Sequence, residues 1–337
     1  MKQGLGSDLH RPLIVLLAVA ALLAPLVFYP VFLMKALCFA LFACAFNLLV
    51  GYTGLMSFGH AAFFGLGSYV TAHAMKNWGV TPELALLASI AANALLGLVF
   101  GWLSVRRVGI YFSMVTLALS QIVYFYALQA PWTGGEDGIQ GVPRGALFGF
   151  IDLRDSFHLY YFVLAVFVAG FALIQRTVHS PFGHVLKGIR ENEQRALSLG
   201  YRVERYKILA FTISAALSGL AGATKCLVFE SASLGDIYWP MSGEVVLMTL
   251  IGGMGLLWGP VVGAFVLVAM GLYLAQFGAW LTVIEGLIFV VCVLCFRSGL
   301  AGPIAALLER LRTPPSAQPM KAAASPVEAA ADVPPLN

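Results

Sequence analysis

The sequence predicts an all-α integral membrane protein, a polytopic bundle of about ten transmembrane helices (8–10). Of its 337 residues 60% are hydrophobic and only 11% are charged, and the mean hydropathy is +0.87. A soluble domain carries roughly 25% charged residues. Apolar runs also recur at the length of about 20 residues that a membrane-spanning helix needs. Helices satisfy all their backbone polar groups within the segment, so we expect helical spans.

The candidate spans follow from a scan for apolar runs of that length. The first is expected to be an uncleaved span, because no clear small-residue cleavage site precedes Tyr29 and Pro30. Short polar breaks interrupt the apolar runs at 51–57 and 258–260. A re-entrant or broken helix at either break would change the number of transmembrane spans. The candidates are 12–33, 35–50, 57–76, 83–105, 109–130, 158–175, 207–228, 241–257, 260–278 and 280–296.

Lysine and arginine predict the orientation, because cytoplasmic loops are enriched in them. A cytoplasmic N-terminus (1–11) and a transmembrane domain over 12–300 place the basic loop 177–206 and the tail 301–337 on the cytoplasmic side. The stretch 176–207, which contains this loop, holds seven basic residues and three acidic ones. The loop 131–157, expected on the external side, holds four acidic and two basic residues. The tail is rich in Pro and Ala, and we expect it to be largely disordered.

The stretch GYTGLMSFGHAAFFGLGSYV (51–70) combines five glycines with polar residues inside an apolar chain. Its first four glycines resemble those of LIGGMGLLWGPVVGA (250–264), although glycine is common where transmembrane helices pack. A five-plus-five inverted repeat would not place both stretches on the cytoplasmic side. We expect a helix break here, with 51–60 against the translocation path or a second subunit.

Uncharged polar residues near this break and on one side of the fifth span form a candidate pathway for a neutral or zwitterionic cargo. Singly, each has a structural explanation, because Ser and Thr bond back to their own helix and Asn and Gln join helices. We expect His60 to be a packed, neutral hydrogen-bonding side chain. The set is Asn47, Thr53, Ser57, His60, Thr116, Ser120 and Gln121.

Catalysis is not expected. The chain has no GxxxxGK[ST] motif to bind ATP phosphates, and its histidines and cysteines are scattered, so neither a cofactor nor a metal site is predicted. Energy must come from a partner ATPase or an ion gradient. Glu244, Glu285 and Lys225 lie near the outer ends of spans, whereas a proton relay needs acids at mid-membrane. A proton-coupled secondary transporter and a passive channel remain alternatives.

The loop 177–206 carries the signs of a folded element. Ser180 can cap a helix, Pro181 suits its first position, and Gly200 suits a left-handed stop. Gly183 and Gly188 favour two short helices over one. A solvated loop would explain the basic residues alone, whereas the caps and the amphipathic pattern favour a docking surface for a cytoplasmic partner.

Several stretches resemble permeases of branched-chain amino-acid ABC importers, in the order that family shows over roughly 30–300. They are PFGHVLKGIRENEQRALSLGYRVERYKILAFTISAALSGLAGA (181–223), NLLVGYTGLMSFGHAAFFGLGSYV (47–70), TGGEDGIQGVPR (133–144), GPVVGA (259–264) and FRSGLAG (296–302). The resemblance is greatest to the LivM-type permease.

The resemblance implies a multi-pass subunit of a bacterial inner membrane that works by alternating access. Implied partners are a second, LivH-like permease, two LivG- and LivF-like ATPases, and a periplasmic substrate-binding protein. Import of urea or short amides by the same machinery is the alternative cargo. By motif position, the ATPase-coupling element would include Gly188, Arg190, Glu191, Asn192, Glu193, Arg195 and Gly200.

Overall fold

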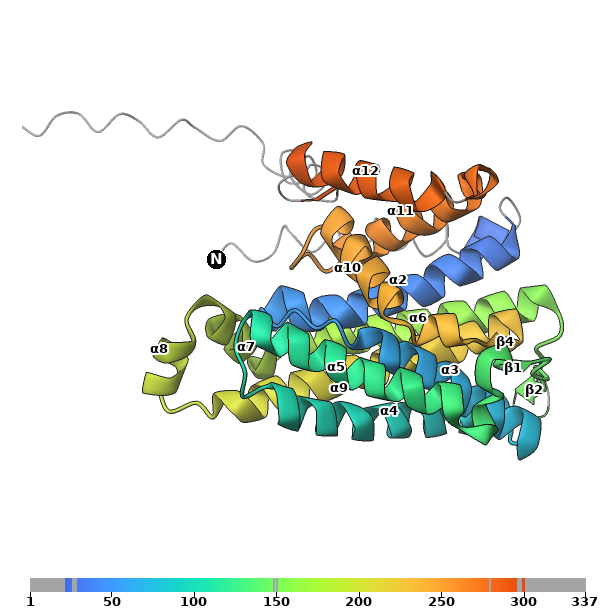
Figure 1. Ribbon diagram of the computed structural model, residues 1–337, viewed down its shortest axis with the longest axis horizontal. Helices are drawn as coiled ribbons and strands as arrows, with labels where there is room; N and C mark the ends of the chain where they lie inside the picture. The colour runs from blue at the N-terminus through green and yellow to red at the C-terminus, as the bar shows by residue number, and fades with distance from the viewer. Residues whose placement is uncertain are drawn as a thin grey trace, which may run out of the picture. The chain divides into compact units, whose positions relative to one another are not determined.

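The computed structural model describes residues 22–25, 29–147, 149, 151–278, 280–295 and 299–300 (Figure 1). The expected first span falls largely outside the described residues, and the N-terminus 1–11 and the tail 301–337 fall outside them entirely.

Long helices dominate the described part of the chain. Each candidate span from 35–50 onward overlaps one helix, which confirms the all-α membrane fold. The break expected at 258–260 lies earlier, at 253–258, because α10 ends at Gly252 and Gly253 and Gly255 take positive φ. Five of these helices, α2, α4, α5, α6 and α9, are long and apolar enough to cross a membrane, and α11 is a shorter apolar helix. The helices are α2 (Pro30–Thr53), α3 (His60–Asn77), α4 (Pro82–Ser104), α5 (Ile110–Gln129), α6 (Ser156–Val178), α9 (Val203–Phe229), α10 (Trp239–Gly252), α11 (Gly259–Tyr273) and α12 (Trp280–Cys295).

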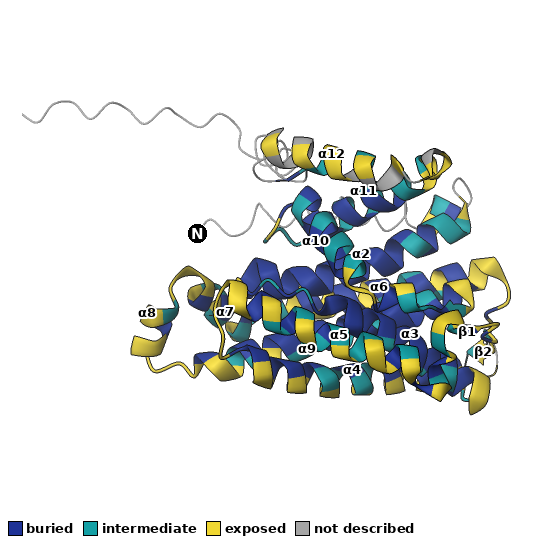
Figure 2. Ribbon diagram, in the orientation of Figure 1, coloured by how far each residue is buried: buried dark blue, intermediate teal, exposed yellow. Residues whose placement is uncertain are grey.

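The core is built around α2 and α9. Helix α2 is buried along nearly its whole length and packs against α6, α9 and α11 (Figure 2). Where α3 crosses α9, a side chain on Gly67 would overlap the backbone of Gly219, and one on Gly222 would overlap Phe64. Small residues permit this close backbone approach, which drives helix association in lipid.

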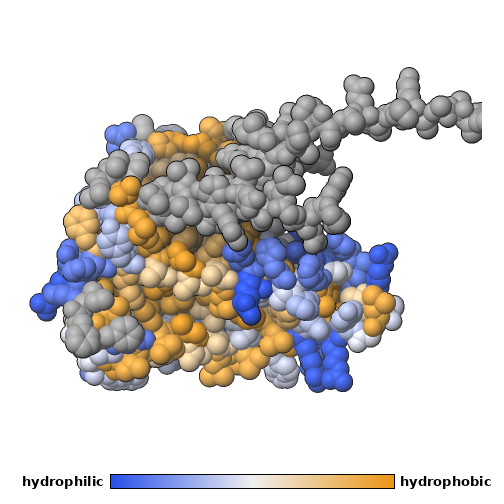
Figure 3. Space-filling model, turned by 180° about the vertical axis from the view of Figure 1, so that it is seen from behind, coloured by the Kyte–Doolittle hydropathy of each residue, from blue (hydrophilic) through white to orange (hydrophobic). Residues whose placement is uncertain are grey.

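Helices α4, α5 and α6 form much of the apolar outer surface. Less than half of each is buried, and many of their exposed side chains are large and hydrophobic, such as Leu87, Phe125 and Leu173. Figure 3 shows hydrophobic surface across the middle of one face, with hydrophilic side chains toward both ends. This is the distribution expected for a protein surrounded by lipid.

Short elements occupy the two ends of the bundle (Figure 1). The loop end comprises 130–155 and 230–238. It contains the 3₁₀ turns η1 (Pro131–Thr133), η2 (Gly135–Asp137) and η3 (Leu234–Asp236) and the strands β1 (Ile139–Gln140), β2 (Ala146–Leu147), β3 (Ile151–Asp152) and β4 (Ser231–Ala232). Strands β1 and β4 pair antiparallel with Ile139 opposite Ala232, and β2 pairs with β3.

The helix-pair end comprises α7 (Pro181–Glu191) and α8 (Glu193–Ser198). The prediction of two short helices is confirmed, but the division does not fall at a glycine. Gly183 and Gly188 both lie inside α7, and the break is at Asn192, whose backbone is extended (φ −157°, ψ 100°). Its side chain accepts a hydrogen bond from the Arg195 N–H and caps α8.

Candidate functional site

The predicted helix break follows α2, at residues 54–59. Gly54 takes a left-handed conformation (φ 75°), and regular helix resumes at His60. Two side chains of α5 satisfy the irregular backbone: the Ser113 hydroxyl donates to the Met56 carbonyl (2.6 Å), and Thr116 Oγ1 accepts from the Phe58 N–H (3.2 Å). Irregular backbone at membrane depth requires such protein partners. Helix α5 therefore braces this first break.

A second break, 253–258, separates α10 from α11. Gly253 and Gly255 have positive φ (111° and 80°). The Asn47 side chain of α2 makes two hydrogen bonds to it: Nδ2 donates to the Leu256 carbonyl (2.9 Å), and Oδ1 accepts from the Gly255 N–H (3.0 Å). One asparagine thus joins α2 to this loop.

The two breaks lie side by side. A Cβ atom added to Gly51 would stand only 2.9 Å from the Gly255 nitrogen, so the backbone of the last turn of α2 lies close to that of the second break, beside the Asn47 side chain. This contact gives a packing reason for glycine at position 51. Close backbone approach needs no duplication of the sequence.

Most of the candidate pathway residues lie in the interior of the protein. Asn47, Thr53, Ser57, His60, Thr116 and Ser120 are buried, and Gln121 is half-buried. Several hydroxyls have local partners: Thr53 donates to the Leu49 carbonyl of its own helix (2.5 Å), and Ser57 Oγ accepts from the Gly59 N–H (3.2 Å). The Ser120 hydroxyl differs, because it is buried without a hydrogen-bond partner in the structure.

His60 is packed as predicted. Its Nε2 lies 2.9 Å from the Ser214 hydroxyl, which donates onward to the Ala45 carbonyl (2.6 Å). The rings of Phe46, Phe63 and Phe211 surround the imidazole, with centroids 5.0–5.8 Å away.

Sequence reasoning missed Ser113, Ser214 and Ser242, which all bond to backbone or side chains around the first break; the Ser242 hydroxyl, for example, accepts from the Ala61 N–H (2.9 Å). A signal existed for Ser113. It lies three and seven residues before Thr116 and Ser120, which is the spacing of one helix face. Three of the five buried residues of α5 are thus polar, and hydroxyl side chains are common where helices pack in a membrane.

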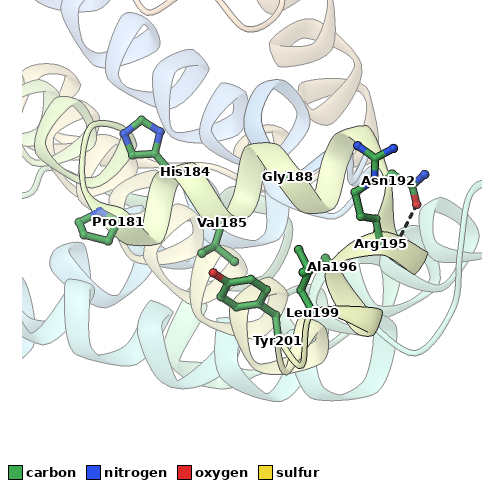
Figure 4. Close-up of a pocket in the computed structure, with 9 residues that line it drawn as sticks. All are labelled: Pro181, His184, Val185, Gly188, Asn192, Arg195, Ala196, Leu199 and Tyr201. Carbon is green, nitrogen blue, oxygen red and sulfur yellow. Dashed lines mark hydrogen bonds between the residues drawn. The ribbon is translucent and has the colours of Figure 1, made fainter.

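The helix pair has a groove on its surface. Ser180 accepts from the Gly183 N–H and Pro181 occupies the first helical position, as predicted. Gly200 (φ 85°) ends the pair, as expected. Between these points the groove encloses about 460 Å³ and is lined by Pro181, His184, Val185, Gly188, Asn192, Arg195, Ala196, Leu199 and Tyr201 (Figure 4).

The residues of the expected coupling element point in different directions. Gly188, Asn192 and Arg195 line the groove, and Glu191 is exposed. Glu193 instead pairs with buried Lys207 of α9 (2.7 Å), which anchors α8. Arg190 also turns away from the groove, and its Nη1 donates to the Gly51 carbonyl in the last turn of α2.

A family model described as "Branched-chain amino acid transport system / permease component" matches residues 29–294. The chain belongs to this family. The match includes all the long helices, both breaks and the helix pair, and it agrees with the resemblance seen in the sequence. It makes this chain a multi-pass membrane protein of the transport-permease class.

Three relatives illustrate how this permease-family chain compares with known proteins. It is 28% identical over 282 residues to the high-affinity branched-chain amino acid transport system permease protein LivM of Escherichia coli (strain K12). That match covers 75% of this chain and 65% of the relative, so the chain spans less than two thirds of that protein's length.

The other two relatives are more distant. A probable branched-chain amino acid transport permease protein LivH of Methanocaldococcus jannaschii is 25% identical, with 64% of this chain and 70% of the relative covered. The autoinducer 2 import system permease protein LsrC of Klebsiella pneumoniae is 27% identical, with 54% of each chain covered.

Proposed function

We propose that this chain is the membrane-spanning permease subunit of an ATP-driven importer, and that it forms the pathway for branched-chain or related amino acids. The groove on α7 and α8 is the observation that carries the proposal for a permease-family member. It has an apolar lining that includes Leu199, which is 71% exposed, and the nearby Leu197 is 49% exposed. Exposed apolar surface at the end of a bundle, away from lipid, marks a protein interaction site.

The groove is proposed to receive an ATPase subunit. Gly188, Asn192 and Arg195 would contact it directly, Glu191 would lie at the rim, and Glu193 and Gly200 would hold the shape of the pair. Because the sequence contains no Walker loop, hydrolysis would belong to two ATPase partners. A second permease and a periplasmic binding protein would complete the assembly.

This assignment implies an orientation in the bacterial inner membrane. The helix-pair end, with the basic loop 177–206, would face the cytoplasm together with both termini. The loop end, which carries exposed Glu136 and Asp137, would face the binding protein that delivers cargo.

The cargo pathway is proposed to run beside the braced first break, along α5. Asn47, Thr53, Ser57, His60, Thr116, Ser120 and Gln121 would line or support it. Most of their hydrogen bonds hold the breaks in shape, so they would act mainly as supports. Ser120 is the best candidate for direct contact with cargo, because a buried hydroxyl without a partner is costly unless something uses it.

Transport by the reconstituted complex tests the class of transporter. The chain, its candidate ATPases and a candidate binding protein are reconstituted in proteoliposomes, and uptake of labelled leucine, isoleucine, valine, urea and autoinducer 2 is measured. We expect uptake of a branched-chain amino acid that requires ATP hydrolysis. Uptake that follows a proton gradient, or passive flux without ATP, would instead support a secondary transporter or a channel.

Ser120→Ala tests the pathway. The variant should accumulate normally, because the Ser120 hydroxyl has no hydrogen-bond partner among the described residues, while the KM for cargo rises if the hydroxyl contacts it. Ser104→Ala is the matched control, since Ser104 is buried outside the proposed pathway and its hydroxyl donates to the Phe100 carbonyl of its own helix (2.6 Å). Equal uptake kinetics in Ser120→Ala and the parental protein would remove Ser120 from the pathway.

A further inference from the structure

The guanidinium of Arg190 lies where the two helix breaks meet. Its Nη1 donates to the Gly51 carbonyl at the end of α2. A Cβ atom on Gly54 would stand 3.3 Å from Arg190 Cγ, and one on Gly255 would stand 3.2 Å from Nη1. Arg190 thus lies beside Gly54 of the first break and Gly255 of the second, while its hydrogen bond is to the Gly51 carbonyl of α2.

Helix α7 therefore has one face that lines the groove and another that faces the helix breaks. Gly188 lines the groove, and Arg190 follows two residues later, about 200° further around the helix axis. The face opposite the groove is the one that contacts the breaks. A displacement of α7 from the groove side would reach Arg190 through a rigid helix.

A second set of contacts continues this connection. Lys187 Nζ lies 5.5 Å from the centre of the Tyr52 ring, so α7 is joined to the last turn of α2 at two places. From α2, the two Asn47 hydrogen bonds reach the second break. The helix pair, the end of α2 and loop 253–258 form one contiguous unit.

We propose that Arg190 is a positioning residue that transmits movement of the helix pair to both helix breaks at once. Its guanidinium holds the end of α2 by a hydrogen bond, and the same side chain lies against Gly54 of the first break and Gly255 of the second. The α2–α3 and α10–α11 junctions then change together when an ATPase moves α7. This inference rests on the proposed docking of an ATPase in the groove.

A cysteine reporter in the second break measures the transmission. Met254 is 44% exposed, and Met254→Cys is labelled with a water-soluble maleimide in the complete complex. Rates are compared without nucleotide and with ATP plus vanadate, after subtraction of labelling of the parental cysteines. We expect the two rates to differ by about tenfold, within the usual range of coupling between sites.

Adding Arg190→Met should abolish this difference while the ATPases remain bound. Arg190→Lys, with a single point charge, should restore part of it. Arg202→Met is the matched control, because Arg202 is an exposed arginine of the same end, and it should keep the full response.

The outcomes separate this inference from the proposed function. A parental chain that binds no ATPase contradicts the proposed function. A bound, hydrolysing complex without a labelling response overturns the role of Arg190. An undiminished response in Arg190→Met, or loss of the ATPases from that variant, overturns it also. If Arg190→Met fails to accumulate, a reduced response in Arg190→Lys supports the inference and a full one contradicts it.

Discussion

The two ends of the bundle are held together in different ways. At the loop end, Lys225 of α9 pairs with Asp236 of η3 (2.7 Å), and both side chains are largely buried. Arg144 binds the last carbonyls of α9, at Leu227 (3.1 Å) and Val228 (2.8 Å). Pairing of β1 with β4 adds backbone hydrogen bonds.

At the helix-pair end, the contacts of α7 with the end of α2 depend on side chains that are not buried. Arg190, which is exposed, reaches the Gly51 carbonyl, and half-buried Lys187 lies over the Tyr52 ring. Such contacts are remade at small cost, whereas separating buried charges is expensive. The difference indicates that the loop end is a fixed frame and that the helix-pair end can move.

Lys225→Met should give the largest loss of stability, because it leaves Asp236 buried without its counter-charge. Breaking a buried pair from one side costs about 3 kcal/mol or more. We expect the free energy of unfolding, measured by denaturation in mixed micelles, to fall by about that amount. The double variant Lys225→Met/Asp236→Leu is the control and should recover much of the loss. A single variant as stable as the parental protein would show that this end is not a fixed frame.

Arg144→Gln should have the next largest effect. Arg144 binds two carbonyls at the end of α9 and also the Glu230 carboxylate (3.0 Å). Losing charge-assisted bonds to the helix end should lower the free energy of unfolding by about 1–2 kcal/mol. Glu230→Gln is the matched control. Because the Glu230 side chain is 48% exposed, its ion pair should contribute less than about 1 kcal/mol. Equal losses from the two substitutions would contradict the assignment to the carbonyls.

Lys207→Met makes the same substitution as Lys225→Met at the opposite end of α9, and its effect on stability should be smaller. The partner of Lys207, Glu193, is 37% exposed and stays hydrated when the lysine is removed. We expect a change below about 1 kcal/mol. The change should appear instead as faster backbone amide exchange in α8. A loss equal to that of Lys225→Met would remove the contrast between the ends.

Features that depend on a short stretch of sequence could be predicted, and features that depend on tertiary contacts could not. The long helices were predictable because the length and polarity of an apolar run are local properties. The caps at Ser180, Pro181 and Gly200 were predictable for the same reason. The break at Asn192 was missed, because the cap that its side chain makes outweighs two glycines that a helix tolerates.

The tertiary contacts between distant segments could not be predicted from the sequence. The helix break after α2 could be predicted, but its neighbour 253–258 could not be placed beside it, because that contact joins residues some 200 positions apart. The direction in which the Arg190 side chain points could not be predicted either. A basic loop predicts a surface toward the cytoplasm, and only the fold shows that one of its arginines turns back to Gly51.

Substitutions at Gly188 should give the smallest change in stability. They also distinguish the role of the groove from the role of the helix breaks. A Cβ atom at this position meets nothing within 4 Å, so Gly188→Ala should stabilise α7 by about 0.5–1 kcal/mol and leave the groove open. Gly188→Trp should fold equally well, because its ring projects from the same open position into the groove. It should nevertheless prevent an ATPase from docking, as measured by co-purification and by ATP-dependent uptake. If Gly188→Trp retains the ATPase and full uptake, the groove is not the docking site and the partner must bind another surface of the helix pair.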